Sequence, residues 1–357
     1  MPTTTLSQRY FVSPEVFAEE EAAIFERQWV CVGHQSQLAQ SGDYFTAEVA
    51  GESVLLVRDQ AGAIGAFYNV CRHRGTRLCE AAAGHSAAIQ CPYHAWTYAL
   101  DGRLVGAPHM DAVEGFRKVD YSLGLVRLGI WEGFLFVNMT EEAASLEEMF
   151  TPLAGKFTHW NLPNLRSGRR VEYDVRANWK LIFENYSECY HCPGVHPMLS
   201  RVSPYDSAEN DLTAGPFLGG FMKISRGASL TMSGRACALP VGEISAEEHA
   251  RVFYYSIFPN MLLSLHPDYV MVHQLWPRAP DRTRIFCDWF FHPDAFARDD
   301  FHPEDAVEFW DVTNKQDWHV CELSQLGIAS RAYRPGPYSP RESIPAAWDR
   351  EYLRHVG

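Results

Sequence analysis

The sequence predicts an α+β protein with two domains, an all-β domain followed by an antiparallel sheet that is covered by helices. Its 357 residues are long enough for two domains with buried cores. Short runs of β-branched and aromatic residues, interrupted by glycine, occupy residues 42–138. Strand-like runs recur between residues 251 and 291, and a long helical pattern follows at 303–326. Strands followed by a covering helix are typical of an α+β domain.

The composition excludes several classes of protein. Hydrophobic residues make up 46% of the chain and charged residues 21%, so we expect an ordered globular protein. The net charge of −13 and the lack of a basic run argue against a nucleic-acid partner. No apolar run approaches the roughly 18 residues of a membrane span. The N-terminus also lacks the pattern of a signal peptide. We therefore expect a cytoplasmic protein with no membrane partner.

The first half divides into a helical segment and a β domain. Residues 1–37 are predicted to be helical, because apolar residues recur at helical spacing over 14–38, after Pro14. Residues 38–155 are predicted to form the β domain, with a meander from Gly42 and a hairpin turn at Asp101-Gly102. A further strand pair is expected at 124–128 and 133–138, and an acidic helix at 141–157.

The second domain, residues 156–357, mixes strands and helices. A strand is expected at 169–179, followed by a helix that runs to 192 and is interrupted at Pro193-Gly194. Four more strands are predicted, at 251–258, 261–266, 269–276 and 284–291. The proline-rich residues 331–342, after the helix at 303–326, exclude regular structure.

Two short chelating loops lie in the first domain. They are Cys71-x-His73 and Cys91-x-x-His94, with 17 residues between them. Two thiolates and two imidazoles suit a Rieske [2Fe-2S] cluster, in which cysteines bind one iron and histidines the other. A structural zinc would accept the same four residues. Each loop carries one residue of each type, which favours the Rieske cluster over zinc and over buried residues of an ordinary core.

Nine cysteines in a reducing compartment are not expected to form a disulfide framework. Those outside the chelating loops and outside the second site below are expected to be small core residues: Cys31, Cys79, Cys237, Cys287 and Cys321.

A second metal site is predicted in the second domain. His191 and His196 are five residues apart, and Pro193-Gly194 between them lets the chain fold back so that both imidazoles face one point. Two histidines with one carboxylate form the usual site of mononuclear non-haem iron(II), which leaves positions open for O2 and substrate. The alternatives are ordinary capping or core histidines, and a thiolate zinc site that uses Cys189 and Cys192.

The carboxylate of this site comes from elsewhere in the chain. The late helix offers five candidates, among which residue chemistry does not choose: Asp305, Glu308, Asp311, Asp317 and Glu322.

With these motifs the chain resembles, over nearly its whole length, the alpha subunits of Rieske non-haem iron oxygenases, a family of ring-hydroxylating enzymes and related demethylases. The family binds its cluster through a Cys-x-His and Cys-x-x-His pattern, which here is Cys71, His73, Cys91 and His94. Its iron motif is a carboxylate followed three residues later by one histidine and five later by another, here Glu188, His191 and His196.

The resemblance also implies a third iron ligand and an assembly. The family's late aspartate, before a Cys-Glu pair, corresponds to Asp317, with Asp311 as the next candidate. The implied architecture is an all-β Rieske domain and a helix-grip catalytic domain, assembled as a head-to-tail homotrimer. In that ring Glu188 would bridge His94 of one subunit to His191 of the next and carry electrons between them.

Glu188 also bears on the substrate. The family usually has aspartate at this position, and glutamate resembles the branch that acts on quaternary ammonium compounds such as carnitine, glycine betaine and stachydrine. A methylated ammonium would be held by cation–π contacts. The aromatic residues expected to form that pocket are Phe183, Tyr186, Phe221, Tyr254, Phe258, Tyr269 and Trp276.

The predicted function is that of a terminal oxygenase with a Rieske cluster and a mononuclear Fe(II). A separate flavin or iron–sulfur reductase, with or without a ferredoxin, would supply electrons from NAD(P)H, since the chain has no Gly-rich dinucleotide motif. O2 would then hydroxylate or N-demethylate a small substrate. One alternative is a ring-hydroxylating mono- or dioxygenase of an aromatic acid. Another is a Rieske electron carrier without catalysis.

Overall fold

The computed structural model describes residues 4–356, which form two compact units. One, here called the β unit, runs from Phe25 to Thr151, and the other, the mixed unit, combines the described residues up to Ile24 with those from Pro152 onward. The predicted boundary near residue 155 lies close to this division, whereas the predicted segment 1–37 is shared between the two units. None of the helices within residues 4–356 combines the length and apolar composition that crossing a bilayer requires.

The β unit consists of short antiparallel strands in three sheets. The largest has the order β4 (Ile64–Tyr68), β3 (Glu52–Arg58), β2 (Asp43–Val49) and β5 (Ala83–His85). A second has the order β1 (Val30–His34), β10 (Phe134–Asn138) and β9 (Arg127–Trp131). A third, small sheet has the order β6 (Ile89–Gln90), β7 (Thr97–Tyr98) and β8 (Leu104–Gly106). One chelating loop, 71–73, follows β4 of the largest sheet, and the other, 91–94, connects β6 to β7 of the small sheet. Both pack on a core that includes Leu55, Trp96 and Tyr98.

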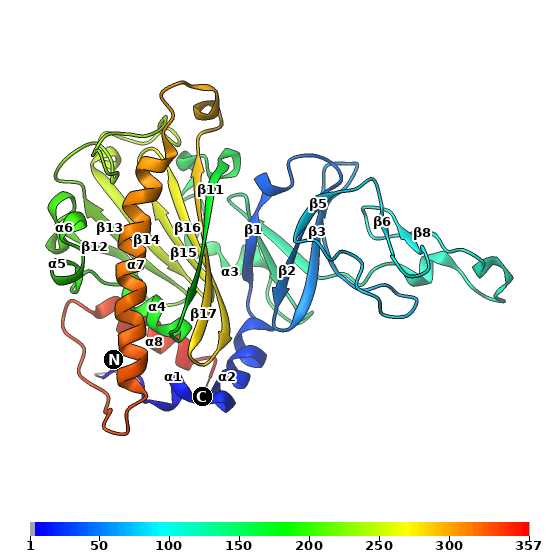
Figure 1. The fold of residues 1–357 in the computed structure, drawn as a ribbon, viewed down its shortest axis with the longest axis horizontal. Coiled ribbons are helices and arrows are strands. Elements are labelled where there is room, and N and C mark those ends of the chain that lie inside the picture. The colour runs from blue at the N-terminus through cyan, green and yellow to red at the C-terminus, as the bar shows by residue number, and fades with distance from the viewer. Residues whose placement is uncertain (1–3, 357) are drawn as a thin grey trace. The chain divides into compact units, whose positions relative to one another are not determined.

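The mixed unit is a seven-stranded antiparallel sheet with helices (Figure 1). Its strand order is β11 (Arg166–Val175), β17 (Arg282–Phe291), β16 (Val270–Ala279), β15 (Met261–Leu265), β14 (Arg251–Ile257), β13 (Phe217–Lys223) and β12 (Glu209–Thr213). Its helices are α1 (Arg9–Val12), α2 (Pro14–Glu20), α4 (Trp179–Tyr186), α5 (Cys192–Val195), α6 (Pro197–Val202), α7 (Pro303–Ile328) and α8 (Ser343–Leu353).

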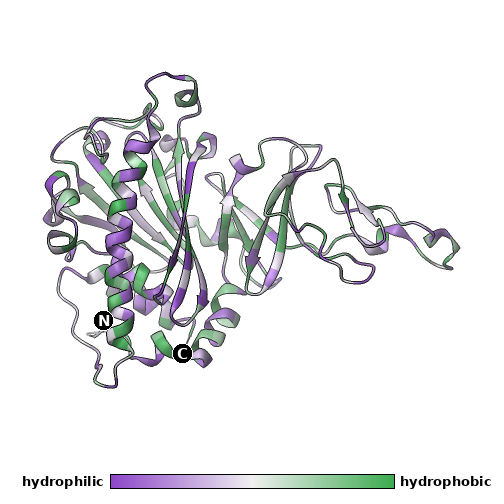
Figure 2. Cartoon of the chain, in the orientation of Figure 1, coloured by the Kyte–Doolittle hydropathy of each residue, from purple (hydrophilic) through white to green (hydrophobic). Residues whose placement is uncertain are grey.

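Helix α7 runs along the sheet, as the helical pattern at 303–326 predicts (Figure 1). Its buried residues recur every three or four positions, which places them on one face of the helix. They are Ala306, Phe309, Trp310, Thr313, Asn314, Trp318, Cys321, Gln325 and Ile328. Hydrophilic residues cover much of the rest of the helix, and hydrophobic residues are frequent on the strands behind it (Figure 2).

Several predicted elements are wrong in extent. The helix expected over 14–38 ends at Phe25 as a π-helical turn, because residues 30–34 pair with β10 instead. The acidic helix at 141–157 is reduced to α3 (Leu146–Met149) and 3₁₀ turns. Pro152 lacks the N–H that a continuing helix needs, and Gly155 has a positive φ of 73°.

The elements that were not predicted include β12, β13 and α8. The Gly219-Gly220 pair inside β13 has the composition of a turn, which concealed that strand. The five cysteines expected to be core residues are indeed free and buried. A single disulfide is present among the described residues, between Cys189 and Cys192.

A cluster of buried charges joins α2, α4 and α8. The ammonium of Lys180 pairs with Glu20, and both side chains are fully buried. Glu20 also accepts hydrogen bonds from Trp179 Nε1 at 2.8 Å and from the Tyr352 hydroxyl at 2.6 Å. Such a buried charge needs all its partners, because removing one leaves the other uncompensated. This cluster holds the start of α4 in place.

Asp349 of α8 lies in the same region and accepts a 2.6 Å hydrogen bond from Tyr338. Burial raises its pKa from 3.8 to about 6, even though hydrogen bonds and Lys180 act in the opposite direction. Burial, together with the nearby charge of Asp349, also raises the pKa of Glu184 well above its usual value. Between about pH 4 and pH 6 the folded state therefore holds a proton on Asp349 that the unfolded chain has released.

We expect Asp349→Asn to gain stability relative to the wild type as the pH rises from about 4 to about 7. Because the pKa is raised on folding, the stabilisation is fully present below the unfolded value and is lost as the pH rises through the folded value. The amide does not titrate, so the difference in unfolding free energy should grow by roughly 3 kcal/mol over this range. Urea denaturation at several pH values measures it, with the exposed Asp299→Asn as the control. A difference that does not change with pH would contradict the prediction.

Candidate functional site

The two chelating loops of the β unit have the same backbone conformation. The Gly75 N–H donates to the Cys71 carbonyl at 3.0 Å, and the Ala95 N–H donates to the Cys91 carbonyl at 3.1 Å. Gly75 and Ala95 both have positive φ, at 75° and 57°. Such tight turns leave each cysteine and its histidine on one side of the loop, so the two loops face each other across a common space.

The side chains of these loops suit a [2Fe-2S] cluster. The Nδ1 atoms of His73 and His94 are buried and have no hydrogen-bond partner within residues 4–356, and the two rings are 4.7 Å apart between centroids. Unpartnered buried imidazole nitrogens are costly unless they bind a ligand. Although burial acts in the opposite direction, the backbone N–H groups of Tyr93 and His94 lower the pKa of the Cys91 thiol, which favours the thiolate that metals bind.

Aromatic residues of the small sheet hold this site. The Trp96 ring stacks on His73 at 4.8 Å between centroids, with an interplanar angle of 9°. The Tyr98 oxygen accepts a 3.0 Å hydrogen bond from the Arg72 N–H, and its hydroxyl lies 3.4 Å from Cys71 Sγ. When Cys71 is a thiolate its sulfur can only accept, so the Tyr98 O–H then donates to it. Hydrogen bonds to cysteine sulfur tune the potential of an iron–sulfur cluster.

The second group of candidate ligands lies in a turn after α4. The predicted helix to residue 192 is wrong: α4 ends at Tyr186, and the Ser187 N–H caps it by donating to Phe183 and Glu184 carbonyls. Glu188 and His191 therefore lie beyond the helix, and Pro193 is in the first turn of the short α5. His196 follows between α5 and α6. This reversal brings the two histidines together, as the break at Pro193-Gly194 predicts.

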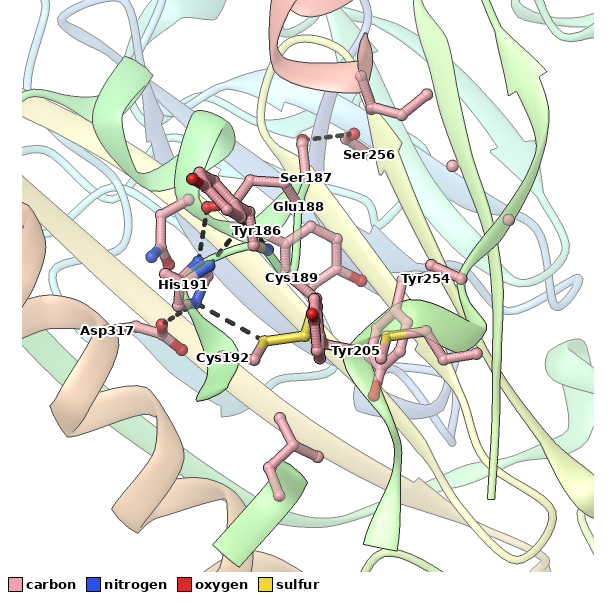
Figure 3. Close-up of a pocket in the computed structure, with 18 of the residues that line it drawn as sticks. Tyr186, Ser187, Glu188, Cys189, His191, Cys192, Tyr205, Tyr254, Ser256 and Asp317 are labelled. Atoms are coloured by element: carbon pink, nitrogen blue, oxygen red, sulfur yellow. Dashed lines mark hydrogen bonds and ion pairs between the residues drawn. A yellow bond between two sulfur atoms is a disulfide. The ribbon is translucent and has the colours of Figure 1, made fainter. Parts of the chain in front are cut away.

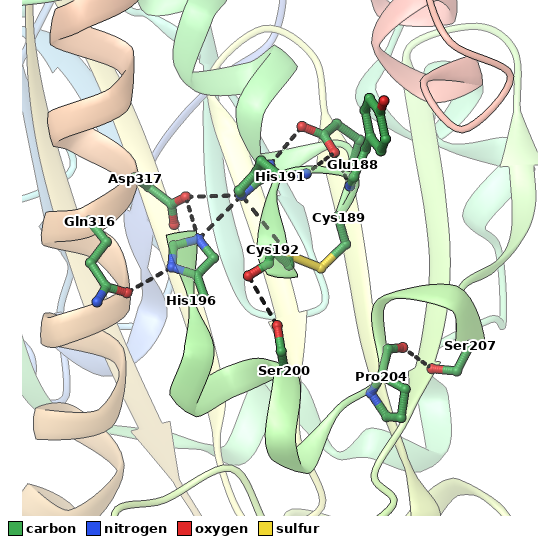
Figure 4. The surroundings of a disulfide bond; sticks show 11 residues. Glu188, Cys189, His191, Cys192, His196, Ser200, Pro204, Ser207, Gln316 and Asp317 are labelled. Atoms are coloured by element: carbon green, nitrogen blue, oxygen red, sulfur yellow. Dashed lines mark hydrogen bonds and ion pairs between the residues drawn. A yellow bond between two sulfur atoms is a disulfide. The ribbon is translucent and has the colours of Figure 1, made fainter. Parts of the chain in front are cut away.

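Three ligand atoms meet beside α7 (Figure 4). His196 Nε2 lies 2.8 Å and His191 Nε2 3.3 Å from Asp317 Oδ1, and the two nitrogens are 3.2 Å apart. A first-row metal with perpendicular bonds of about 2.1 Å holds adjacent ligand atoms about 3 Å apart. One ion thus fits all three atoms. Two imidazoles and a carboxylate on one face are the donor set of non-haem iron(II).

Outer hydrogen bonds orient both histidines. His191 Nδ1 lies 2.6 Å from Glu188 Oε1, and His196 Nδ1 lies 2.8 Å from Gln316 Oε1. Each Nδ1 therefore acts as a donor, which directs the Nε2 lone pair to the common point. Burial alone would lower the pKa of His191, but hydrogen bonds to Asp317 and Glu188 raise it to about 10. The same histidines lower the pKa of Asp317 against the effect of burial. Metal binding must therefore displace a proton here.

The other carboxylates of α7 are directed elsewhere. Asp311, the next candidate for the third ligand, accepts a 2.9 Å hydrogen bond from Tyr173 and pairs with Lys315 at 2.6 Å. Asp305 binds the backbone N–H of Ser233 at 2.9 Å. The predicted alternative of a thiolate zinc site is not supported by the structure, because Cys189 and Cys192 are joined in a disulfide and offer no thiolate (Figure 4).

A cavity of about 320 Å³ opens beside the triad (Figure 3). Three of the seven aromatic residues predicted to form the pocket line it: Tyr186, Phe221 and Tyr254. The prediction is wrong for the other four, which are core residues outside its lining: Phe183, Phe258, Tyr269 and Trp276. Residue type alone does not distinguish an aromatic residue of the core from one that lines a cavity, because both are buried.

The pocket has a continuous aromatic wall. The ring centroids of Tyr254 lie 6.2 Å from Trp310 and 5.9 Å from Tyr186. His273 continues the row, 6.3 Å from Tyr186 and 5.9 Å from Trp318. We call Trp310, Tyr254, Tyr186, His273 and Trp318 the aromatic wall. Burial lowers the pKa of His273 to about 4, so the row is uncharged at neutral pH.

Part of this wall, and Gln316, which accepts the hydrogen bond from His196, were not predicted from the sequence. Trp310, Asn314 and Asp317 line the same pocket and are spaced four and three residues apart on α7, so helical periodicity from Asp317 was the signal that could have identified the tryptophan. The pocket lining also contains Gly219 and Gly220 of β13, the strand that pairs with the strand of Tyr254. A Cβ at Gly219 would lie 2.0 Å from the Tyr254 carbonyl oxygen, so a side chain cannot be accommodated there.

Comparison with known proteins identifies the family. Residues 162–357 match the ring-hydroxylating alpha subunit family in its catalytic domain, and residues 28–117 match the Rieske [2Fe-2S] domain. The chain belongs to the Rieske non-haem iron oxygenases. The oxygenase therefore carries a Rieske [2Fe-2S] cluster and a mononuclear iron, and both donor sets described above suit these groups. A Rieske electron carrier would not need the catalytic domain.

Relatives of the oxygenase are similar over most of their length. The glycine betaine monooxygenase oxygenase subunit of Chromohalobacter salexigens is 32% identical, and the match covers 94% of this chain and 82% of the relative. The carnitine monooxygenase oxygenase subunit of Escherichia coli is 31% identical over 92% of this chain and 86% of its own. The crystal structure of the quaternary ammonium Rieske monooxygenase CntA with L-carnitine has a TM-score of 0.81 at 28% identity, covering 99% and 96% of the two chains.

Naphthalene 1,2-dioxygenase from Rhodococcus has the same fold, with a TM-score of 0.81 at 21% identity over 99% of this chain and 94% of its own. The oxygenase thus has the α+β architecture predicted from the sequence, a Rieske domain and an antiparallel catalytic domain with helices.

We expect Tyr98→Phe to lower the reduction potential of the cluster while leaving it assembled. The variant loses one hydrogen bond to Cys71 Sγ, which stabilises the reduced cluster by roughly 0.5 to 1.5 kcal/mol, or about 20 to 65 mV for one electron. Redox titration followed by EPR measures the shift. Tyr68→Phe, on β4 of the same unit, is the control and should leave the potential unchanged. An unaltered potential in Tyr98→Phe would show that the hydroxyl does not act on the cluster.

Proposed function

We propose that the oxygenase oxidises an N-methyl group of a quaternary ammonium compound of the betaine or carnitine type. The observation that carries this proposal is the aromatic wall beside the His191, His196 and Asp317 triad. A methylated ammonium has no N–H to donate, so a protein recognises it through the faces of aromatic rings. Each such contact contributes about 0.5 to 2 kcal/mol. A row of rings next to the iron ligands would hold an N-methyl group within reach of the reaction.

The relatives support the same substrate class. Those with the highest similarity reported above act, by their names, on glycine betaine and carnitine. Glu188 supports the same substrate class, because glutamate at this position resembles the branch of the family that acts on quaternary ammonium compounds. We therefore favour a quaternary ammonium substrate over an aromatic acid, the other substrate class that the sequence leaves open. As an oxygenase subunit the chain receives electrons from a separate reductase.

We propose His191, His196 and Asp317 as the iron ligands. When bound there, iron supplies the activation of O2 that no side chain can supply. The residues of the chain supply the rest. Glu188 and Gln316 hold the imidazoles in one tautomer, and the triad keeps three ligands on one face so that the opposite face is open to the pocket.

We further propose Cys71, His73, Cys91 and His94 as the cluster ligands and a homotrimer as the assembly. In the proposed trimer Glu188, already bonded to His191, would reach His94 of the neighbouring subunit. Charge-assisted hydrogen bonds on both sides of one carboxylate would connect the two rings over a short path. The inter-subunit contact is the part of this arrangement that needs an experiment.

We expect the reconstituted oxygenase, with a surrogate reductase and NADH, to release formaldehyde or the corresponding aldehyde from betaines. NADH and O2 consumption should be coupled to product in a ratio near one. The screen includes glycine betaine, carnitine and γ-butyrobetaine, with benzoate-type acids as the comparison. Ring hydroxylation of an aromatic acid without aldehyde from any betaine would reject the proposed substrate class. NADH oxidation without product does not count as turnover.

We expect Asp317→Ala to lose mononuclear iron and all turnover but to keep the cluster spectrum, because the two metals lie in different units. Asp311→Ala is the matched control on the same helix and should keep both iron and activity. Iron is counted by metal analysis against cluster absorbance. Loss of iron in Asp311→Ala with retention in Asp317→Ala would show that the third ligand is misassigned.

We expect Glu188→Gln to bind both metals and to reoxidise the reduced cluster far more slowly in the presence of substrate and O2. Glutamine has the size of glutamate but lacks the charge that strengthens both hydrogen bonds, each worth roughly 1.5 to 3 kcal/mol. Single-turnover stopped-flow spectroscopy on the prereduced protein measures the rate, and light scattering measures the trimer. A variant that reoxidises at the wild-type rate would exclude Glu188 from the electron path.

A further inference from the structure

The substrate pocket contains one lysine or arginine side chain among its described lining residues, that of Arg341. Arg341 lies near the end of the proline-rich segment before α8, and Ser343 and Ile344 of the first turn of α8 also line the pocket. Within residues 4–356 its guanidinium has no carboxylate partner, in contrast to most of the arginines of the mixed unit that flank the sheet. Arg341 is thus a cation at the pocket that the protein itself does not neutralise.

Tyr205 holds this cation from one side. The Arg341 Cζ lies 5.0 Å from the centroid of the Tyr205 ring, and Tyr205 also lines the pocket. A guanidinium that stacks on a ring through its face keeps the N–H groups of its edge free. Those edges match a carboxylate in a bidentate pair. The contact with Tyr205 therefore orients Arg341 without using the donors that would bind an anion.

The opposite charge lies elsewhere in the pocket. The acidic lining residues are Glu188 and Asp317, both engaged by the iron-site histidines. Figure 3 shows Asp317 and His191 on one side of the pocket, and Tyr205 and Tyr254 on the other. The pocket therefore has its candidate iron site at one end, the aromatic wall along it and a free guanidinium near Tyr205. This is the charge pattern that suits a zwitterion with a cationic head and an anionic tail.

We infer that Arg341 binds the carboxylate of the substrate and makes the oxygenase selective for carboxylated quaternary ammonium compounds over quaternary amino alcohols. This inference rests on the proposed function. The trimethylammonium group is the same in glycine betaine and in choline, so the aromatic wall treats them alike. Only the carboxylate can pair with Arg341, while the hydroxyl of choline offers no charge. Selectivity is then a property of the part of the pocket near Tyr205.

The test compares three ligands and four proteins. Dissociation constants for glycine betaine, carnitine and choline are measured by calorimetry under anaerobic conditions on the metal-loaded wild type, Arg341→Gln, Arg341→Lys and Arg331→Gln. KM and kcat are measured on the same proteins. Arg331 is an exposed arginine of the same segment outside the pocket lining, which makes it the matched control.

Arg341→Gln should weaken binding of the carboxylated ligand that the wild type prefers by at least about tenfold, the loss expected for a charged hydrogen-bonded pair. Its kcat should stay within about twofold and its affinity for choline should not change, because the reacting end is untouched. Arg341→Lys should fall between, since it keeps the charge and loses the bidentate geometry. Arg331→Gln should behave as the wild type.

Equal affinity for the carboxylated ligands in Arg341→Gln and wild type would overturn the inference. So would an equal loss for choline, or a wild type that prefers choline, since either would show that Arg341 does not recognise a carboxylate. A wild type that neither binds nor oxidises any quaternary ammonium compound would instead overturn the proposed function, and the two failures are therefore distinguishable.

Discussion

The packing of α7 on the seven-stranded sheet is the constraint on which the active site depends. This one helix contributes the candidate third iron ligand Asp317 and two rings of the aromatic wall, Trp310 and Trp318. It also contributes Gln316, which accepts a hydrogen bond from His196. Its buried face is fixed by hydrophobic contact with the strands, and a buried face leaves a helix no freedom to rotate about its axis. The same packing that stabilises the unit therefore positions the carboxylate within about 3 Å of both histidines.

The turn that contains the histidines follows α4, and a cluster of buried charges fixes the position of that helix. Lys180 near the start of α4 pairs with Glu20, and the Tyr352 hydroxyl of α8 donates a hydrogen bond to the same carboxylate. Helices from the N-terminal and C-terminal parts of the chain therefore stabilise the position of α4. Burying a lysine is costly, and it is tolerated only because its partners are all in place. Helix α4 ends one residue before the turn that contains Glu188 and His191, so the position of the helix determines where these two side chains lie.

The cavity has three parts that differ in charge: the candidate iron ligands, the aromatic wall and the guanidinium of Arg341. At one end Glu188 and Gln316 direct the imidazoles toward a common point, and the carboxylates there are neutralised by the histidines. The aromatic wall is uncharged, because burial keeps His273 neutral at physiological pH. A free guanidinium lies near Tyr205. A pocket with this sequence of charges orients an asymmetric ligand before any reaction occurs, which is how positioning contributes to catalysis.

The sequence alone predicted the cysteine and histidine members of the two donor sets, because each pair of them is local. Cys71 with His73, Cys91 with His94, and His191 with His196 are each only a few residues apart, so residue type and spacing identify them. The strands at 251–291 and helix α7 were also predictable, since their hydrophobic periodicity is strong. Strand β13 and helix α8 were not, because a glycine pair interrupts one and tertiary packing rather than pattern stabilises the other.

Only the tertiary structure shows which carboxylate of α7 and which rings lie beside the two histidines. Asp311 and Asp317 occur on the same helix, but at about 100° per residue they are about a third of a turn apart around its axis. Asp311 consequently meets Tyr173 whereas Asp317 meets the histidines. The same holds for the successive residues Tyr254 and Tyr255 of β14, which point to opposite faces of the strand: Tyr254 lines the cavity, and Tyr255 is buried outside its lining. Such choices depend on which face an element turns to its neighbour, and local sequence does not contain the position of that neighbour.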